Sequence, residues 1–198
     1  QVLQALHEGH MELHYQPKVR VSSGQVVGAE ALVRWRHPQR GLLAPGSFLP
    51  QILGTPAARA LDDWVLDAAI AQAAAWAARG LALPVSINMS VPSLVAAEFL
   101  PRLSRLLAAR PALPAGAVEI ELLETETMSD LSQVRRAIEA LAELGVSVSI
   151  DDFGTGYSTL SYLQQLPAKS LKIDQSFVRD LLERPMDRAL VRGIIGLA

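Results

Sequence analysis

The sequence predicts an α/β fold with a mainly parallel sheet. Segments with the two-residue alternation of a strand and segments with helical spacing follow one another along the chain, an order typical of α/β proteins. The strand expected at 26–33 is mostly apolar, as in a strand that is buried on both faces. Half of the 198 residues are apolar, which is enough to bury one sizeable core and favours a single domain.

The expected elements are bounded by ordinary start and stop signals. Strands are expected at 11–16, 26–33, 84–90, 118–124, 146–152 and 170–174, and helices at 57–79, from Pro92 onward, at 130–144, at 157–165 and at 187–198. Gly80 and Gly145 are plausible helix stops, and Ser129 or Asp130 is a plausible helix cap. The Pro- and Gly-rich stretch 38–56 is interpreted as a functional or packing loop, not as a domain boundary.

The bulk composition excludes several classes of protein. The formal net charge is −2, without the basic excess of a protein that coats a nucleic-acid polymer or an anionic membrane. There are no cysteines, so disulfides, thiolate metal sites and cysteine nucleophiles are excluded. No apolar run reaches the roughly 18 residues of a membrane span, and no signal-peptide pattern opens the chain.

Polar side chains recur late in successive strands. They are Gln16, Glu30, Asn88, Glu121, Glu124, Asp151, Asp152, Lys172 and Asp174. In a closed α/β barrel the carboxyl ends of the strands converge on one face, where the chemistry is done. One pocket could therefore collect four or five carboxylates, an amide and a lysine.

Crowded carboxylates cost free energy, because like charges raise each other's pKa, and a bound divalent metal ion removes that cost. Oxygen ligands without His or Cys favour Mg²⁺ or Mn²⁺. Asp151 and Asp152 are adjacent and could bridge two ions about 3.5–4 Å apart, which would polarise a phosphodiester and activate a water molecule. Lys172 could hold that water or offset charge in the transition state.

Each of these residues also has an ordinary explanation. A single acid at a strand end is more often a helix cap or an ion-pair partner, and a lone Asp-Asp pair is more often a turn. Recurrence on successive strands is what favours a metal-dependent hydrolase or lyase barrel. Asp152-Phe153-Gly154 resembles the metal-binding triplet of protein kinases, but the other kinase motifs do not precede it. The four histidines fit no metal-ligand spacing.

Several short motifs follow one another along the chain. They are Tyr15-Gln16-Pro17, Glu30-Ala31-Leu32-Val33-Arg34-Trp35, His37-Pro38, Asn88-Met89-Ser90, Glu121-Leu122-Leu123-Glu124-Thr125, Asp151-Asp152-Phe153-Gly154-Thr155-Gly156-Tyr157-Ser158 and Leu171-Lys172-Ile173-Asp174. In this order and spacing they resemble the bacterial EAL domain family, and the resemblance covers the whole chain.

The resemblance implies a fold, a reaction and a set of metal ligands. The fold would be a (β/α)₈ TIM-like barrel whose first strand is antiparallel to the rest. The reaction would be hydrolysis of cyclic di-GMP to linear pGpG with Mg²⁺ or Mn²⁺. The metal ligands would be Glu30, Asn88, Glu121, Asp151 and Asp152. Lys172 would position the water and would count, with Glu121, Asp151 and Asp152, among the catalytic residues.

The resemblance also implies substrate contacts and partners. Gln16, Leu32, Arg34 and Asp174 would contact the nucleotide, and the forked donors of Arg34 suit a phosphate oxygen. Glu124 would anchor the loop 153–158, in which Gly154 and Gly156 give the backbone freedom. A homodimer, a regulatory domain before residue 1 and a cytoplasmic location are expected.

Three departures from the family pattern stand out. Leu123 replaces the usual Thr, so a hydroxyl beside the loop anchor is lost, and Leu123→Thr is expected to raise activity at limiting Mg²⁺. Ile52-Leu53 stands where the family has Ala-Glu. Two later family motifs are absent from residues 1–198, so the domain is expected to be incomplete at its C-terminus, with C-terminal strands missing. Alone it is expected to be inactive, and about 50–60 further residues should complete the barrel.

Two other functions remain open at this point. A catalytically degenerate EAL domain could bind and sense cyclic di-GMP without cutting it. A purely structural scaffold is the third possibility. Retention of every expected acidic and amide ligand within this stretch favours the enzyme. Turnover with Mg²⁺ separates the enzyme from the sensor, and nucleotide binding separates the sensor from the scaffold.

Overall fold

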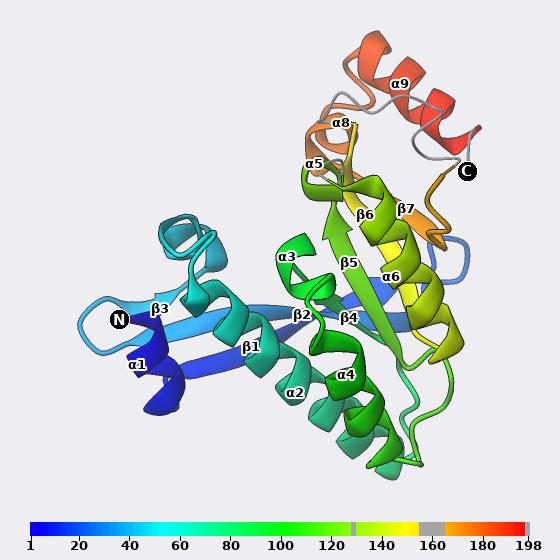
Figure 1. The fold of residues 1–198 in the computed structure, drawn as a ribbon. Helices are drawn as coiled ribbons and strands as arrows, with labels where there is room; N and C mark the ends of the chain where they lie inside the picture. The colour runs from blue at the N-terminus through cyan, green and yellow to red at the C-terminus, as the bar shows by residue number, and fades with distance from the viewer. Residues whose placement is uncertain (128–129, 155–164, 197–198) are drawn as a thin grey trace.

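The computed structural model describes residues 1–127, 130–154 and 165–196, and the strands among them form one seven-stranded sheet (Figure 1). The main order is β1-β2-β4-β5-β6-β7, and β3 pairs with β2. The strands are β1 (Met11–Val19), β2 (Val26–His37), β3 (Gly41–Leu43), β4 (Val85–Asn88), β5 (Val118–Leu123), β6 (Ser147–Phe153) and β7 (Ser170–Ile173).

The first strand is antiparallel and the others along the main path are parallel. β1 pairs antiparallel with β2, with Gln16 opposite Glu30. β2, β4, β5, β6 and β7 then pair parallel to one another. This mixed sheet confirms the expected α/β class with its antiparallel first strand. β1 and β7 stand at the two ends of the order.

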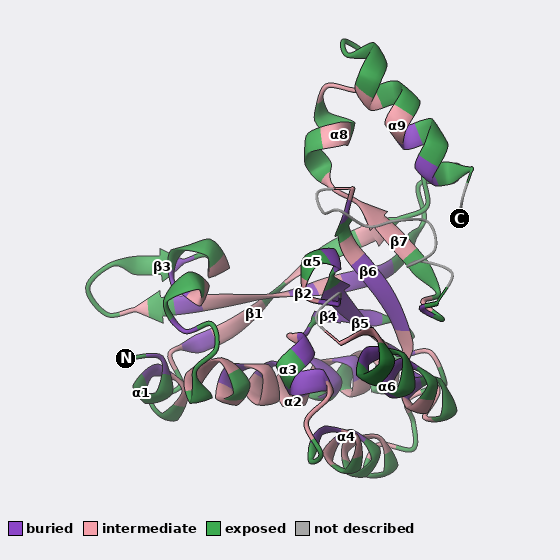
Figure 2. Cartoon of the chain, turned by 45° about the horizontal axis from the view of Figure 1, so that its top comes forward, coloured by how far each residue is buried: buried purple, intermediate pink, exposed green. Residues whose placement is uncertain are grey.

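Helices alternate with the strands, and most of the longer ones lie on one side of the sheet (Figure 2). They are α1 (Val2–His7), α2 (Pro56–Ala78), α3 (Val91–Leu94), α4 (Phe99–Ala108), α5 (Glu124–Thr127), α6 (Leu131–Glu143), α8 (Gln175–Arg179) and α9 (Pro185–Ile195), with short 3-10 turns η1 (Pro45–Ser47) and η2 (Leu49–Gln51). Pro56 opens α2 because its missing N–H is not needed in a first turn. No helix in the described part of the chain is long and apolar enough to cross a membrane.

The two faces of the central strands carry different side chains. Ile87, Ile120, Leu122 and Ile150 are fully buried, on the face against which the helices pack. Successive side chains of a strand point to opposite faces. The residues beside these four in sequence, such as Ser86, Glu121 and Asp151, therefore lie on the other face, and most of them are polar or charged. The alternation thus places one core under the helices and gathers the polar residues on the other face.

Several expected boundaries differ from the structure. The strand expected at 26–33 continues to His37 and pairs there with β3, which lies inside the stretch expected to be a loop. Glu124 was expected late in a strand, and this is wrong: β5 ends at Leu123 and Glu124 begins α5. The expected helix 157–165 falls mostly outside the described residues.

Candidate metal centre

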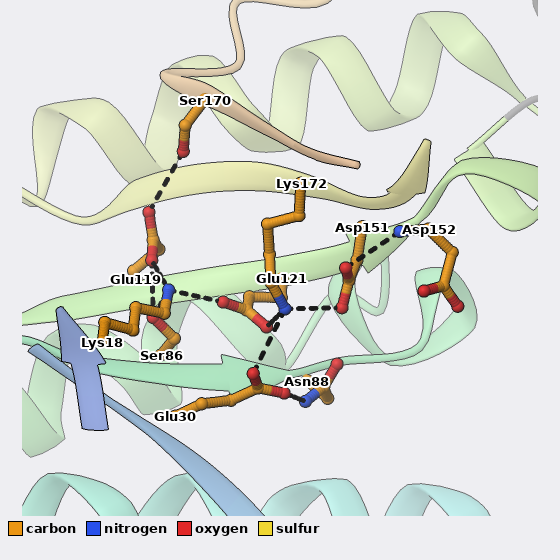
Figure 3. A network of polar contacts seen from close by, with 10 residues as sticks. All are labelled: Lys18, Glu30, Ser86, Asn88, Glu119, Glu121, Asp151, Asp152, Ser170 and Lys172. Carbon is orange, nitrogen blue, oxygen red and sulfur yellow. Dashed lines mark hydrogen bonds and ion pairs between the residues drawn. The ribbon is translucent and has the colours of Figure 1, made fainter. Parts of the chain in front are cut away.

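Three carboxylates from three strands meet at one ammonium group (Figure 3). Lys172 Nζ, on β7, lies 2.5 Å from Glu121 Oε2, 2.7 Å from Asp151 Oδ2 and 3.3 Å from Glu30 Oε2. Glu30 lies on β2, Glu121 on β5 and Asp151 on β6. The parallel pairing of these strands brings to one place residues that are 142 positions apart in the chain.

Burial sets the electrostatics of this cluster. Glu121 is 1% exposed, and burial raises the pKa of its carboxyl in spite of hydrogen bonds from Lys172 and Lys18, with Glu30 raising it further. Burial by itself would lower the pKa of Lys172, but its hydrogen bonds to Asp151 and Glu121 outweigh burial and raise that pKa. The ammonium group is therefore held in its charged form.

The cluster suits a divalent metal ion. Glu30, Glu121 and Asp151 each offer one carboxylate oxygen, and these three oxygens lie within 4.8 Å of one another. The donors are hard oxygens, which Mg²⁺, Mn²⁺ and Ca²⁺ prefer. The Lys172 ammonium touches all three carboxylates, so the site already stabilises a positive charge. The residues present therefore fit a metal ion.

Asn88 is the fourth expected ligand, and it stands beside the cluster at the end of β4. Its Nδ2 donates a hydrogen bond of 2.9 Å to Glu30 Oε1, which fixes the orientation of the amide relative to that carboxylate. Ser90, two residues on, caps α3 by accepting from the backbone N–H of Ser93, and its hydroxyl donates to Asp62 Oδ2 at 2.6 Å. A half-buried acid on α2 thus supports the segment that carries Asn88.

Asp152 has an unusual backbone. Its φ is +53°, which makes it the one non-glycine residue with positive φ in the described ranges, and such strain costs roughly 1–3 kcal/mol and clusters at functional sites. Its N–H donates to Asp151 Oδ1 at 2.9 Å. Burial, with Asp151 and Asp174 nearby, raises the pKa of the Asp152 carboxyl. Asp152 lies next to the three-carboxylate cluster and is not one of its members.

Glu124 holds the start of the loop that follows β6. Its Oε2 accepts a hydrogen bond of 2.9 Å from the backbone N–H of Gly154, and the residue is 1% exposed. Gly154 has φ +102°, and a Cβ there would lie 2.9 Å from the ring of Phe177. Both facts require glycine at this position. Residues 155–158 of the expected loop, including Gly156, lie outside the described residues.

A cavity of about 730 Å³ opens beside the carboxylates. Glu30, Asn88, Glu121, Asp151 and Asp152 line one part of its wall, and apolar side chains line much of the rest, among them Leu32, Leu49, Leu53, Leu61, Val65 and Leu123. This volume lies within the range of about 300–1,000 Å³ that is usual for ligand pockets.

One of the four expected substrate contacts lies in the wall of this cavity. Leu32 lines the cavity, whereas Gln16, Arg34 and Asp174 are not among its lining residues. The Arg34 guanidinium donates to the backbone carbonyl of Val33 at 2.8 Å. Asp174 caps α8 by accepting from the N–H of Ser176 at 2.9 Å. Gln16 faces Glu30 across the β1–β2 pair.

Sequence reasoning missed a second group of polar residues, which lies next to the carboxylate cluster. Lys18, Ser86 and Glu119 contact one another on the same face of the sheet (Figure 3). The signal was present, because Lys18, Ser86 and Glu119 each stand two residues before or after an expected site residue on the same strand. Strand-end position alone did not select them.

The fold and the site define an α/β barrel-type protein with a cluster of oxygen ligands at the carboxyl ends of parallel strands. The chain belongs to the EAL domain family, whose model matches residues 1–198. The solved structure titled "PaMucR Phosphodiesterase, c-di-GMP complex" matches with a TM-score of 0.92 and 39% identity, over 99% of this chain and 79% of that one. EAL enzyme Bd1971, in its form bound to cAMP and cyclic-di-GMP, matches with a TM-score of 0.91 and 32% identity, over 100% and 54% of the two chains.

Two curated relatives are named cyclic di-GMP phosphodiesterases. The chain is 41% identical over 191 residues to the cyclic di-GMP phosphodiesterase PA2567 of Pseudomonas aeruginosa, covering 96% of this chain and 32% of that protein. It is 40% identical over 196 residues to the cyclic di-GMP phosphodiesterase NbdA of the same organism, covering 98% and 25%. The chain thus spans about a third or less of the length of these relatives.

Proposed function

We propose that residues 1–198 are part of an EAL phosphodiesterase domain that, in the intact protein, hydrolyses cyclic di-GMP to linear pGpG. The observation that carries the proposal is the convergence of Glu30, Glu121 and Asp151 on Lys172 beside a cavity large enough for a nucleotide. The names of PA2567 and NbdA support the reaction, and the PaMucR complex supports the nucleotide.

We assign two metal ions, Mg²⁺ or Mn²⁺, to the site. Their ligands are Glu30, Asn88, Glu121, Asp151 and Asp152. Divalent ions bound there would polarise the phosphodiester and lower the pKa of a water molecule. The chain itself fixes the ligand geometry: Asn88 orients Glu30 by a hydrogen bond, and Asp151 accepts from the N–H of Asp152. Such support keeps ligands within a narrow range of positions before the substrate arrives.

Lys172 is assigned to the attacking water. Its Nζ keeps its proton, since the surrounding carboxylates raise its pKa and stabilise the charged form, so it can donate a hydrogen bond to the water oxygen and offset negative charge as the bond to phosphorus forms. Together with Glu121, Asp151 and Asp152 it makes up the catalytic group. Gln16, Leu32, Arg34 and Asp174 are assigned to the nucleotide, with Leu32 in the cavity wall.

The experiment is a hydrolysis assay on the full-length protein with cyclic di-GMP, in which pGpG is separated by chromatography. We expect turnover with Mg²⁺ or Mn²⁺, none after chelation, and recovery when either ion is returned. Titration with Mn²⁺ should give two sites per chain. Tight binding of intact cyclic di-GMP without any pGpG would overturn the enzyme and leave the sensor, and absence of binding would leave the scaffold.

The retained ligand set argues against the degenerate sensor, because Glu30 and both aspartates of the Asp151-Asp152 pair are present. We further propose that the full-length protein is a cytoplasmic homodimer with a regulatory domain before residue 1. The greater length of the curated relatives supports an additional domain. Sedimentation of the full-length protein tests the dimer.

A further inference from the structure

A second lysine contacts the central carboxylate of the site from the opposite side. Lys18 Nζ, on β1, lies 2.7 Å from Glu121 Oε1, while Lys172 Nζ lies 2.5 Å from Glu121 Oε2. The two oxygens of one buried carboxylate therefore each receive an ammonium, one from each end of the sheet order (Figure 3).

Lys18 is itself fixed by a small polar group. Its Nζ also lies 2.7 Å from Glu119 Oε2 and 2.5 Å from Ser86 Oγ. Ser86 donates in turn to Glu119 Oε2 at 2.5 Å, and Ser170 contacts Glu119 Oε1 at 3.4 Å. Because Ser86 on β4 and Glu119 on β5 hold the same ammonium, it stays in contact with Glu121 as long as these hydrogen bonds are kept.

Lys18 occupies the interior of the sheet beside Gly28. Gly28 stands opposite Lys18 in the β1–β2 pair, and a Cβ at residue 28 would lie in ordinary contact with Lys18 Cδ, at 3.9 Å, but only 3.1 Å from the carbonyl oxygen of Pro84. Layers of branched apolar side chains usually fill the interior of an α/β barrel. Here an ion pair between Lys18 and Glu119 occupies such a layer directly beneath the carboxylates.

We propose that Lys18 is a positioning residue for the metal ligand Glu121. It occupies Oε1 and so directs Oε2 toward Glu30 and Asp151, the two carboxylates with which Glu121 forms the oxygen cluster. Glu119 balances the charge of Lys18, so the pair orients Glu121 without adding net charge beneath the site. The proposal rests on the assignment of Glu121 as a metal ligand.

Two physical effects of losing Lys18 have opposite signs, and this makes the proposal testable. Removing an ammonium removes repulsion of a bound cation, which would tighten metal binding if Lys18 contributed charge alone. Removing the hydrogen bond that orients a ligand weakens metal binding, by about 10–100-fold for comparable supporting contacts. The direction of the change in metal affinity therefore separates charge from positioning.

The experiment measures Mn²⁺ binding to the full-length protein by electron paramagnetic resonance, without nucleotide. We expect Lys18→Met to raise the Mn²⁺ dissociation constant about tenfold or more. The double variant Lys18→Met/Glu119→Gln removes one charge of each sign and should show the same weakening. Exposed Lys169, replaced in Lys169→Met, is the matched control and should bind Mn²⁺ like the unaltered protein. In hydrolysis assays at saturating metal, the KM for cyclic di-GMP should stay close to that of the unaltered protein.

Four outcomes overturn the proposal. The first is tighter Mn²⁺ binding by Lys18→Met, and the second is an unchanged Mn²⁺ dissociation constant in that variant with only a lower Tm. The third is weaker Mn²⁺ binding in Lys18→Met together with normal binding in the double variant. The fourth is loss of folding in both variants. Because Mn²⁺ binding is measured without turnover, a protein that binds Mn²⁺ but leaves cyclic di-GMP uncut refutes the proposed reaction and not the role of Lys18.

Discussion

The carboxylate of Glu124 accepts a hydrogen bond from the backbone N–H of Gly154 across 2.9 Å, and thereby ties the start of α5 to the residue that follows β6. The acceptor is buried, and the donor belongs to a backbone position that only glycine fits. This contact ends two residues from Asp152, whose own backbone is strained. The geometry of the second aspartate is therefore coupled to a carboxylate outside the metal cluster.

Loss of this acceptor should weaken the site more than the fold. In Glu124→Ala the part-buried Gly154 N–H loses its partner, and the cost should lie below the roughly 1–3 kcal/mol of a fully buried unsatisfied donor because water can reach it in part. We expect the Mg²⁺ concentration for half-maximal activity to rise several-fold. Glu124→Gln keeps an oxygen that can accept, so it should stay closer to the unaltered protein. Equal losses in both variants would show that charge, and not the hydrogen bond, is what Glu124 supplies.

Neutralising a carboxylate of the cluster should abolish turnover without unfolding the protein. In Glu30→Gln and Asp151→Asn we expect hydrolysis to fall by about 10³-fold or more, which corresponds to about 4 kcal/mol in the transition state. Folding should survive, because one fewer carboxylate relieves repulsion, and the amide oxygen introduced by Glu30→Gln can still accept from Asn88 Nδ2. The checks are hydrolysis rates and thermal melts. Near-normal turnover in Glu30→Gln would contradict the assignment.

Replacement of Lys172 should separate turnover from binding. In Lys172→Ala the three carboxylates lose their shared ammonium, so we expect kcat to fall far more than the affinity for cyclic di-GMP. The metal-free protein should also melt at a lower temperature and gain more from added Mg²⁺ than the unaltered protein does. A parallel fall in kcat and affinity would make Lys172 a phosphate contact instead.

The half-buried acid Asp62 gives a prediction about pH. Burial raises the pKa of its carboxyl in spite of hydrogen bonds from Ser90 and Ser93, and Glu126 raises it further. A carboxyl whose folded pKa lies above its unfolded value stabilises the fold below the unfolded pKa, and this stability is lost as the pH rises through the folded pKa. Asp62→Asn does not titrate and should therefore gain stability relative to the unaltered protein across that range.

The measurement is the free energy of unfolding by urea from acid to neutral pH. Below about pH 3.9, the unfolded pKa of aspartate, the two proteins should differ by a constant amount. As the pH rises above this value, the difference should shift in favour of Asp62→Asn. A shift in favour of Asp62 would mean that its charged form is the stabilised one.

More of the site than of its surroundings could be predicted from the sequence. The convergence of Glu30, Glu121 and Asp151 follows from strand order alone, because the carboxyl ends of parallel strands meet at one edge. The contact between Lys18 and Glu121 depends on the register between strands whose contacting residues are 103 positions apart. A register shift of one residue would have turned Lys18 to the other face, and nothing local fixes that register.

Two other features lay beyond local sequence patterns. The positive φ of Asp152 accompanies a register irregularity between β6 and β7, which only the assembled sheet determines. The effect of Leu123 on the loop anchor stays a prediction; the structure places its side chain in the cavity wall, and Glu124 itself makes the anchor contact. The reason is strand geometry, since Leu123 ends β5 and shares a face with Asp151 in the β5–β6 register.

The outer strands β1 and β7 meet through one side chain. They stand at opposite ends of the sheet order, yet each sends a lysine to the same carboxylate on β5. Glu121 therefore joins the two ends of the sheet order through two ion pairs. A cation bound by this carboxylate would compete with both lysines at once, so its binding is linked to the contacts that join β1 and β7 to β5.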